Sequence, residues 1–503
     1  MMRVVNSRQQ PSAQFFAALL SSPFDLLANQ NGFKTYCFIS KYDLGVFVPI
    51  CVYAANTSQT PNTIWSTVVA ILFVGAICGS IALRIVAEKA GRKSGLLISF
   101  TISLISIGLA IISHFIRSFE LYSVSRVTLG FSLGLSLGLS ALYLSESSPK
   151  QCRGFVSMMT GTIVQFGTVV GSIVAMPTLL GTEASWWIIY AIEAGILLIA
   201  LIAMPFMHDS PGYLALIGEN AKARESIRFF HKCSDDEIDA VLTEIKDNLK
   251  QNAKSIGMFD VHKDKHVLRG TVVGSMVAFA MAFSGIAVIN AFAVELLKSC
   301  GLSVQSASIA NVGLSTVSLI AIIGSAFIVD HFGRRPLILI ANAAILFLNV
   351  AIFGFMFAFE QYGHNWLGYC LIAVIATFIL FFAIGPGPLC YFITAEMVGQ
   401  NARSAGQSWA SLVQMTSRSL LLAIYLPMKN AIGSPFSYLI LFVAPILFSL
   451  VFFYFMLPET KNRNMKEVHE EVERLPTLTH CLGQSRRSRK QSVDTVTTES
   501  IKV

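Results

Sequence analysis

The sequence predicts an all-α membrane protein in which twelve transmembrane helices form two six-helix pseudo-repeats, with a helical insert between them. Three observations predict this fold class: the composition, the spacing of the apolar segments and the duplication of short charged motifs. Of the 503 residues, 54% are hydrophobic and 13% are charged, whereas soluble domains carry about 25% charged residues. This deficit of charge argues against a soluble enzyme or a nucleic-acid-binding domain and indicates a lipid environment.

Eleven apolar segments are long enough to cross a bilayer, which requires about 20 residues of helix. A twelfth, at 33–55, is weaker because Lys34, Lys41 and Asp43 interrupt it, and charges in hydrocarbon are costly unless they face protein or water. The eleven segments lie at about 64–86, 95–114, 121–144, 155–180, 186–207, 270–297, 304–329, 336–359, 367–392, 408–428 and 434–457.

When the weak segment at 33–55 is counted as the first span, one long polar stretch separates the sixth span from the seventh and divides the chain into two halves. It holds ten basic and ten acidic residues, and 235–249 within it predicts an amphipathic helix. The tail is polar enough to stay unfolded; a phosphorylation-regulated switch is the alternative to a plain solvated tail. The expected parts are an N-terminal segment at 1–32, a bundle at 33–211, the helical linker at 212–269, a second bundle at 270–457 and the tail at 458–503.

Lys and Arg gather on one side of the predicted array, and the loops of the other side hold mainly Arg117, Lys298 and Lys429. The positive-inside rule therefore predicts that both termini and the linker are cytoplasmic, most simply in the plasma membrane. On the outer side, Asn56-Thr57-Ser58 is an acceptor pattern for N-glycosylation at Asn56. The first residues lack the order of a cleaved signal peptide, so we expect the first helix itself to direct insertion.

The sequence offers no sign of metal or covalent chemistry. The nine cysteines are scattered singly, without a CxxC pair, which argues against a metal site or a disulfide framework. No phosphate-binding loop or nucleophile constellation is recognisable. We therefore expect no cofactor, no metal and no enzyme activity. The expected partners are a small-molecule solute, the lipid bilayer and, in one reading, protons; we expect a monomer and no nucleic acid.

The two halves repeat each other. Glu-Lys-Ala-Gly-Arg-Lys at 88–93 joins the second and third spans, and Asp-His-Phe-Gly-Arg-Arg at 330–335 joins the eighth and ninth. Parallel repeats around a central site are typical of transporters, in which one half rocks against the other. Further matches pair Glu146 and Arg153 with Glu396 and Arg403, and Asp209-Ser210 with Glu459-Thr460.

These repeated charges predict a cytoplasmic gate. Acids and bases at helix ends are able to pair across the seam between the halves, and such pairs must break whenever that side opens. Each exposed pair contributes only about 0–1 kcal/mol, yet several together bias an equilibrium between states separated by a few kcal/mol. Ordinary charges at helix ends are the alternative. The candidates are Glu88, Arg92, Glu146, Arg153, Asp330, Arg334, Arg335, Glu396, Arg403 and Glu459.

Other motifs follow in a fixed order: Gly75 and Gly79, Arg126 with Gly130, S-E-S-S-P-K-Q-C-R-G from Ser145, Q-F-G-T-V-V-G from Gln165, S-G-I from Ser284, G-P-G-P from Gly385 and P-E-T-K from Pro458. Together with the gate motifs, they resemble the sugar porters of the major facilitator superfamily over residues 42–465. The resemblance implies a twelve-helix carrier with a solute site at mid-depth. The glycines at four-residue spacing predict close helix packing, and Pro386 and Pro388 predict a broken tenth span that lines a cavity.

The solute site departs from the family pattern. The positions where the resemblance implies hydrogen-bonding residues carry Met281, Ala282, Ala287 and Ala383, and Met415 replaces a tryptophan. Because unpaired polar groups of a solute are penalised in a dry site, these changes put ordinary hexose recognition in question. The candidates that remain for binding a solute are Gln165, Ser284, Asn290, Ser318, Tyr391, Gln414 and Arg418.

Four intramembrane charges suggest further roles. The resemblance implies proton coupling through Asp43, Arg126 and Glu193, because an acid that loses an Arg partner in one conformation regains its proton affinity. A static buried pair is the alternative. Arg418, four residues after Gln414, has a planar guanidinium suited to carboxylate or phosphate. It is expected to bind an anionic group of the solute or to balance Glu193; pairing with a neighbouring helix is the alternative.

The sequence therefore predicts a carrier of sugar-porter type that moves a small polar solute by alternating access, with a lean towards proton coupling. A facilitative uniporter of a non-hexose or anionic solute is the first alternative. A nutrient receptor that binds without transporting is the second, favoured by the depleted site and disfavoured by the duplicated gate motifs. A channel is a third, since the broken tenth span could line a pore.

Overall fold

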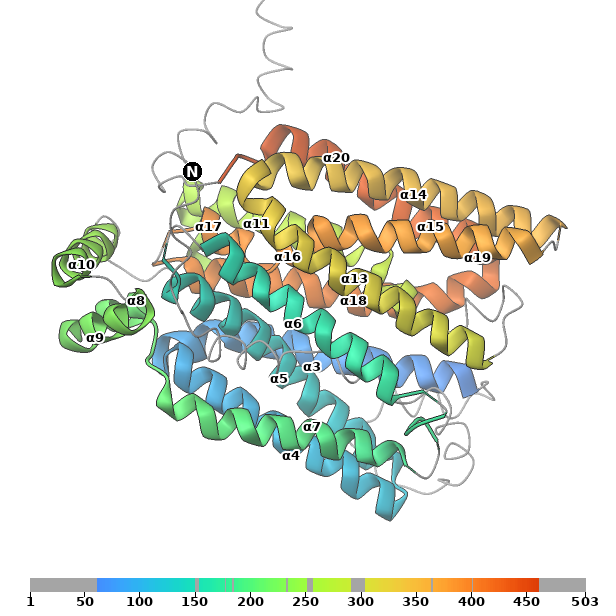
Figure 1. The fold of residues 1–503 in the computed structure, drawn as a ribbon, viewed down its shortest axis with the longest axis horizontal. Coiled ribbons are helices and arrows are strands. Elements are labelled where there is room, and N and C mark those ends of the chain that lie inside the picture. Colours follow the sequence, from blue (N-terminus) through green and yellow to red (C-terminus); the bar gives the residue numbers. More distant parts are fainter. Residues whose placement is uncertain are drawn as a thin grey trace, which may run out of the picture.

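The computed structural model describes residues 61–149, 153–176, 178–182, 185–231, 234–250, 257–290, 304–362, 365–399 and 401–460, and the regular elements of this part of the chain are all helices. Long helices run side by side, and the helices of the insert lie beyond one end of them (Figure 1). We call this the insert end. Asp43, Asn56, the predicted first span and the tail beyond 460 lie outside the described residues.

The first half contributes five long helices, namely α3 (Pro61–Lys89), α4 (Arg92–Ile116), α5 (Phe119–Ser147), α6 (Arg153–Val174) and α7 (Trp186–Ala203). They coincide with the predicted spans two to six. The turn between α4 and α5 shows why the elements end there: Arg117 adopts φ 60°, and the Ser118 hydroxyl accepts a hydrogen bond from Leu121 N at 3.2 Å. Such a cap satisfies one of the free amides of the first turn.

Glycines let α3 and α5 touch along their backbones, which confirms the close helix packing predicted from their spacing. A Cβ built on Gly75 or Gly79 would lie 2.1 Å from a carbonyl oxygen of α5. A Cβ on Gly130 or Gly134 would lie 1.8 or 2.1 Å from a carbonyl oxygen of α3. A methyl group cannot be accommodated at such distances, so these positions require glycine for the helices to pack.

The second half contributes α11 (Lys265–Ala282), α13 (Val304–Phe332), α14 (Arg334–Tyr362), α15 (Asn365–Ile384), α16 (Pro386–Leu389), α17 (Ile393–Met397), α18 (Arg403–Ile432), α19 (Ser434–Tyr438), a π-helical turn (Leu439–Val443) and α20 (Ala444–Met456). The tenth span breaks at Gly385, as predicted. The seventh helix begins five residues before the predicted boundary at 270, because Asp264 caps it and accepts from the amides of His266 and Val267.

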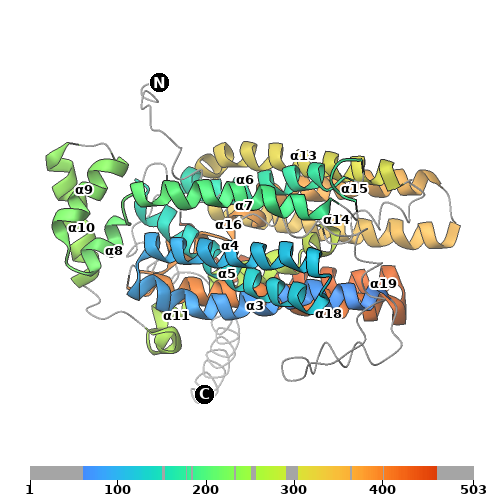
Figure 2. The ribbon, with the colours of Figure 1, turned by 90° about the horizontal axis from the view of Figure 1, so that it is seen from below.

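The span containing α18 is more polar than the others. Ten helices of the described residues are long and apolar enough to cross a membrane, and α18 is not among them despite its 30 residues. One of its sides carries the buried polar residues Ser404, Gln407, Ser408, Ser411 and Gln414. The helix packs against α3 and α11, and Figure 2 shows α3 and α18 side by side. Protein therefore surrounds this polar side, and lipid does not.

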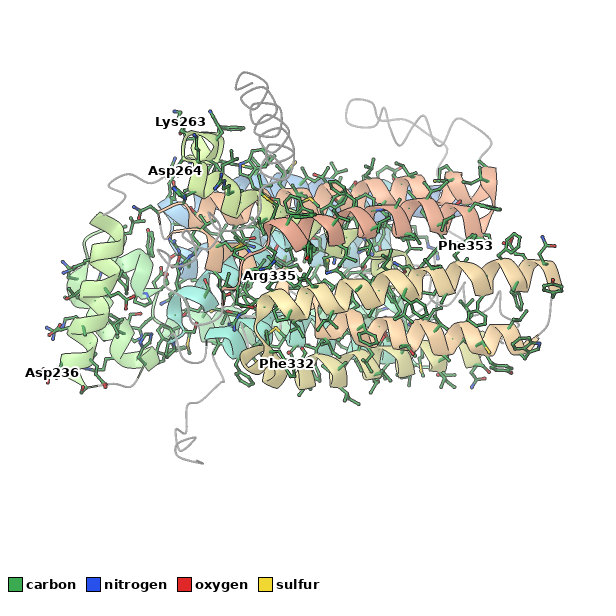
Figure 3. All side chains as sticks on the ribbon, turned by 90° about the horizontal axis from the view of Figure 1, so that it is seen from above. Asp236, Lys263, Asp264, Phe332, Arg335 and Phe353 are labelled. Atoms are coloured by element: carbon green, nitrogen blue, oxygen red, sulfur yellow. The ribbon has the colours of Figure 1, made fainter. Side chains whose placement is uncertain are left out.

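The insert consists of α8 (Pro211–Leu216), α9 (Asn220–His231), α10 (Asp235–Lys250) and a 3₁₀ helix (Met258–Lys263). Its amphipathic helices pack through a small apolar core that includes Leu214, Ile227 and Ile238, and α10 confirms the predicted helix at 235–249. In Figure 3, Asp236, Lys263 and Asp264 lie at the insert end, whereas Phe353 lies towards the opposite end. The long helices thus carry apolar side chains beyond a charged end.

Candidate functional site: a central cavity and two charge networks

A buried charge network ties together three elements of the first half at the insert end. Arg92 Nη2 donates to Glu146 Oε1 at 2.8 Å, and these side chains are 2% and 1% exposed. Ser210 Oγ donates to Glu146 Oε2 at 2.5 Å. Asp209 Oδ1 accepts from the amides of Lys93 at 3.2 Å and Ser210 at 2.7 Å. Burial is the largest influence on Asp209 and raises the pKa of its carboxyl, although those two amides and Arg92 act in the opposite direction.

The second half contains the same network. Arg334 Nη2 donates to Glu396 Oε1 at 3.3 Å, and Thr460 Oγ1 donates to Glu396 Oε2 at 2.7 Å. Glu459 accepts from the amides of Arg334 at 2.9 Å and Arg335 at 3.1 Å. Asp209 and Glu459 therefore each lie at the N-terminus of a helix, α4 or α14, where negative charge is favoured.

A glycine precedes each of these helix starts and leaves room for the acid. Gly91 and Gly333 adopt φ +88° and +86°, a region that favours glycine. A Cβ on either one would lie 2.6 Å from a carboxylate oxygen of Asp209 or Glu459. The duplicated motif thus encodes the same turn, cap and buried pair twice.

Two predicted gate pairs form within one half instead of across the seam. The pairs Arg92–Glu146 and Arg334–Glu396 each lie within one half, because each Arg begins a helix that packs beside the helix or turn of its acid. A contact that does cross the seam joins Ser404 Oγ of α18 to Glu88 Oε1 of α3 at 3.4 Å; Glu88 also pairs with Arg84 at 2.9 Å. Arg403 is buried, and the side chains of Arg153 and Asp330 lie outside the described set.

The two halves meet where α3 packs against α18 and α6 packs against α13. A cavity of about 90 Å³ lies at this seam and is lined from both halves. Its polar lining includes Gln165 and Thr168 of α6 and Asn311, Ser315 and Ser318 of α13, with Asn290, Tyr391 and Arg418 from other segments of the second half. Gln165 Nε2 donates to the carbonyl oxygen of Ser315 at 3.2 Å and so joins the halves directly.

Arg418 is the one charged residue in the described lining of this cavity. Its Nη2 donates to Met281 Sδ at 3.2 Å, and Tyr391 lines the same cavity. Its Nε is buried and has no hydrogen-bond partner among the described residues. A thioether is a weak acceptor, so much of the hydrogen-bonding capacity of the guanidinium is unused in the described surroundings.

Arg126 lies away from the cavity, between α5 and α7. Its side chain is buried, Nε donates to the Tyr122 hydroxyl at 3.0 Å and Nη2 donates to the Tyr190 hydroxyl at 2.8 Å. The guanidinium also lies 4.9 Å from the centre of the Tyr122 ring. Glu193 follows Tyr190 by three residues on α7 and is half-buried. Two of the three predicted proton-coupling residues, Arg126 and Glu193, thus lie on α5 and α7 and do not line the described solute cavity.

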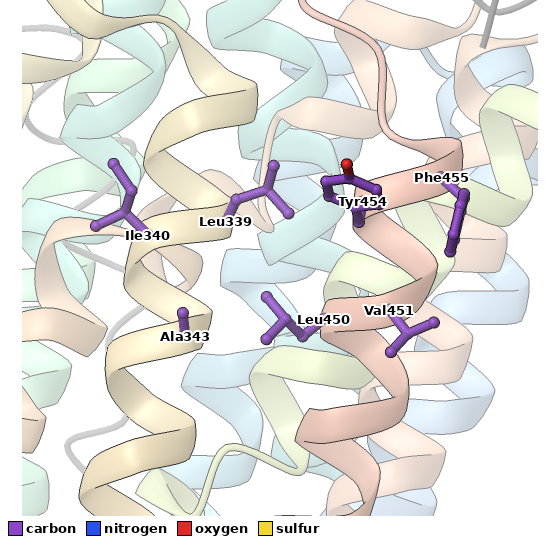
Figure 4. A pocket seen from close by; sticks show the side chains of 7 residues that line it. All are labelled: Leu339, Ile340, Ala343, Leu450, Val451, Tyr454 and Phe455. Atoms are coloured by element: carbon purple, nitrogen blue, oxygen red, sulfur yellow. The ribbon is translucent and has the colours of Figure 1, made fainter. Parts of the chain in front are cut away.

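A larger hollow lies between α14 and α20 and has different chemistry (Figure 4). Its volume is about 520 Å³, and its lining is Leu339, Ile340, Ala343, Leu450, Val451, Tyr454 and Phe455. Ile340, Val451 and Tyr454 are exposed on the outer surface of the helices. A nearly uniform hydrocarbon lining cannot satisfy the hydroxyls of a polar solute, so the central cavity is the candidate site.

The comparisons with known proteins agree with this architecture. A family model described as "Sugar (and other) transporter" matches residues 27–472. The chain belongs to the sugar transporter family. This transporter is 28% identical to facilitated glucose transporter member 3 of solute carrier family 2 from Ovis aries over 432 residues, or 83% of this chain and 84% of the relative. It is 25% identical to facilitated glucose transporter protein 1 of Caenorhabditis elegans over 424 residues, or 83% and 82%.

The transporter also shares the fold of a solved structure. The proton:xylose symporter XylE of the major facilitator superfamily, bound to 6-bromo-6-deoxy-D-glucose, matches 92% of this chain and 97% of its own with a TM-score of 0.75 and 21% identity. This likeness confirms the predicted major facilitator fold. The chain is an integral membrane protein and a solute carrier of sugar-porter type.

The cavity contains five of the seven residues that the sequence predicts for the solute site: Gln165, Asn290, Ser318, Tyr391 and Arg418. Two do not line it. Ser284 Oγ donates to the Met281 carbonyl oxygen at 2.8 Å and accepts from Ile286 N at 3.3 Å, so it holds the break at Gly285, where φ is +108°. Gln414 lies behind Met281 and donates to its sulfur at 3.3 Å.

Three further polar residues line the cavity and are not among those predicted from the sequence: Thr168, Asn311 and Ser315. A signal for them exists in the helical spacing. Asn311, Ser315 and Ser318 of α13 are separated by four and three residues, which places them on one face. Thr168 follows Gln165 by three residues on α6. Polar residues repeated at this spacing in a membrane helix indicate a face that contacts protein or water.

Proposed function

We propose that this transporter moves a small polar solute through the central cavity by alternating access. One observation supports the proposal above the others: the cavity lies at the seam, and each half contributes polar side chains to it. Its volume of about 90 Å³ is smaller than the roughly 300–1,000 Å³ of typical ligand pockets. The halves must therefore move apart to admit a solute of sugar size, and rocking of parallel repeats provides that movement.

The charge networks brace the halves in this proposal, and the seam contact closes the insert end. Each network joins elements of one half through buried hydrogen bonds, so that the half moves as a unit. The hydrogen bond between Ser404 and Glu88 must break when the insert end opens. We assign the insert and both termini to the cytoplasm, which the distribution of Lys and Arg supports. In this topology the transporter works as a monomer in the plasma membrane, glycosylated at Asn56.

A reversible cross-link at the insert end is expected to stop transport. Cysteines introduced by Glu88→Cys and Ser404→Cys replace side chains whose polar atoms lie 3.4 Å apart. A bis-methanethiosulfonate reagent that joins them should abolish uptake of radiolabelled D-glucose, D-xylose and D-glucuronate into proteoliposomes, because the cytoplasmic side can no longer open. Dithiothreitol should restore it.

Matched variants distinguish this effect from general damage. Each single-cysteine variant should keep its uptake after treatment. So should the pair Arg224→Cys and Asp239→Cys, which joins α9 to α10 within the insert, where the wild-type side chains meet at 2.9 Å. Undiminished uptake in a fully cross-linked Glu88→Cys/Ser404→Cys protein would contradict alternating access at this seam. Saturable binding without uptake in the wild type would favour the receptor, and flux that never saturates would favour a channel.

We further propose that transport is coupled to protons through Glu193, Arg126 and Asp43. Burial of the Arg126 guanidinium between two tyrosine hydroxyls supports this proposal, because a charge held in the membrane is typical of proton relays. An acid near such a cation takes up a proton when movement of the helices separates the two.

Proton coupling predicts that an inward proton gradient accelerates uptake and that Glu193→Gln or Asp43→Asn removes the acceleration. Exchange of labelled for unlabelled solute should persist in both variants, because it needs no net proton movement. Glu360→Gln, which changes an exposed acid near the end of α14, should respond to the gradient like the wild type. Wild-type uptake that is the same with and without the gradient would instead establish a facilitative uniporter.

A further inference from the structure

The central cavity contains a positive charge, on Arg418, that a neutral sugar cannot compensate. Arg418 is the one charged residue in the described lining, which holds no carboxylate, and its Nη2 donates to the Met281 sulfur. A guanidinium at membrane depth is costly when it has no counter-charge. Glu193 is not part of the lining and lies on α7, whereas Arg418 lies on α18 at the seam.

The side chains around Arg418 have lost hydrogen-bonding capacity. Met281, Ala287 and Leu422 line the cavity together with it. None of these offers a strong donor or acceptor to a hydroxyl. At this side of the cavity, the guanidinium is therefore the strongest group available for a solute.

The polar residues of α6 and α13 provide complementary chemistry. Gln165, Asn311, Ser315 and Ser318 offer amide and hydroxyl groups, which donate to and accept from alcohol groups. A solute that satisfies both sets must carry several hydroxyls and an anionic group.

The anion is better matched by a carboxylate than by a phosphate. One Arg compensates one negative charge, and its planar fork donates hydrogen bonds to both oxygens of a carboxylate. A phosphate monoester carries about 1.5 to 2 negative charges at neutral pH, which would leave an excess in a cavity whose described lining holds a single cation.

We propose that the cavity binds a hydroxylated monocarboxylate, a sugar acid, with its carboxylate on Arg418 and its hydroxyls on the side chains of α6 and α13. This inference rests on the proposed transport function. It assigns the unused donors of the guanidinium to the solute and accounts for the loss of neutral hydrogen-bonding groups beside it.

The test compares D-glucuronate with its uncharged counterpart D-glucuronamide and with D-glucose, using the full-length protein in proteoliposomes at pH 7. Wild-type uptake of D-glucuronate should exceed that of D-glucuronamide. Arg418→Gln should lower D-glucuronate uptake by about 10- to 100-fold, in keeping with the loss of a hydrogen-bonded charged group, while D-glucuronamide uptake changes little. Arg418→Lys should retain an intermediate preference, because it keeps the charge and loses the fork.

Controls separate this inference from the transport function. Arg117→Gln removes an exposed arginine between α4 and α5 and should behave as the wild type. Thermal unfolding of purified Arg418→Gln without solute identifies a variant that fails to fold. The same measurement with up to 10 mM of each solute tests binding. A rise in unfolding temperature that D-glucuronate causes in the wild type and not in Arg418→Gln would support the proposal independently of uptake.

Wild-type uptake of D-glucose or D-glucuronamide that D-glucuronate neither shares nor inhibits would overturn the sugar-acid assignment and leave transport intact. An Arg418→Gln variant that folds and keeps full D-glucuronate uptake would overturn it as well, and would indicate that Arg418 pairs with a protein acid. Absence of uptake for all three solutes, with no thermal shift, would count against the proposed function itself.

Discussion

Replacing Gly130 with leucine is expected to prevent assembly of the first half. A Cβ at this position would lie 1.8 Å from the carbonyl oxygen of Leu72 and 3.0 Å from the amide of Ala76. Both are backbone atoms of α3, so no side chain is able to turn aside. The helices would have to separate along their length, which would remove the packing that holds membrane helices together. We expect purified Gly130→Leu to lose the monodisperse peak in size-exclusion chromatography, and Gly130→Ala to unfold at a clearly lower temperature.

The matched control is Gly195→Ala on α7, where a Cβ would meet no atom within 4 Å. Alanine has the higher helix propensity, by about 1 kcal/mol, so this variant should be at least as stable as the wild type. Gly108→Ala on α4, which is equally open, provides a second control. If Gly130→Leu elutes and melts like these controls, α3 and α5 do not approach each other as closely as the structure shows.

Arg92→Ala is expected to destabilise the transporter strongly, because it leaves the Glu146 carboxylate buried without its cation. Removing one partner of a buried pair costs about 3–5 kcal/mol, whereas replacing both partners with neutral residues is often far less harmful. The double variant Arg92→Met/Glu146→Gln should therefore be more stable than Arg92→Ala. Thermal unfolding in detergent and the yield of folded protein would measure both effects.

The second network supplies an internal comparison. Arg334 and Glu396 are separated by 3.3 Å and are 5% and 10% exposed, against 2.8 Å with 2% and 1% exposure for Arg92 and Glu146. Because the Arg334–Glu396 pair is longer and slightly more exposed, Arg334→Ala should lower the unfolding temperature less than Arg92→Ala does. Equal stability of Arg92→Ala and the wild type would show that the first pair is not needed to hold its half together.

The sequence predicts most of the fold because the signals are local and repeated. Apolar length locates the helices, Pro386 and Pro388 locate the break in the tenth span, and glycines four residues apart indicate close helix packing without telling which helices meet. Boundaries depend on single caps, and Asp264 therefore starts the seventh helix earlier than the apolar pattern indicates. Charge composition also anticipates the insert and its amphipathic helix α10.

The site is harder to predict because the direction of a side chain depends on tertiary contacts. The repeated charges identify the residues of the two networks and leave open whether an Arg meets an acid of its own half or of the other. Ser284 and Gln414 have suitable chemistry for a solute site, yet one is satisfied by its own helix break and the other by the sulfur of Met281. Asn311 and Ser315 are ordinary polar residues until α13 places them opposite Gln165.

The polarity of α18 has a consequence for how the protein is made. A helix with Ser404, Gln407, Ser408, Ser411 and Gln414 on one side partitions poorly into lipid as an isolated segment, since each polar side chain adds to the free energy of insertion. Its integration during synthesis therefore depends on α3 and α11, which shield that side. Both precede α18 in the chain, so the ribosome delivers the partners before the helix that needs them.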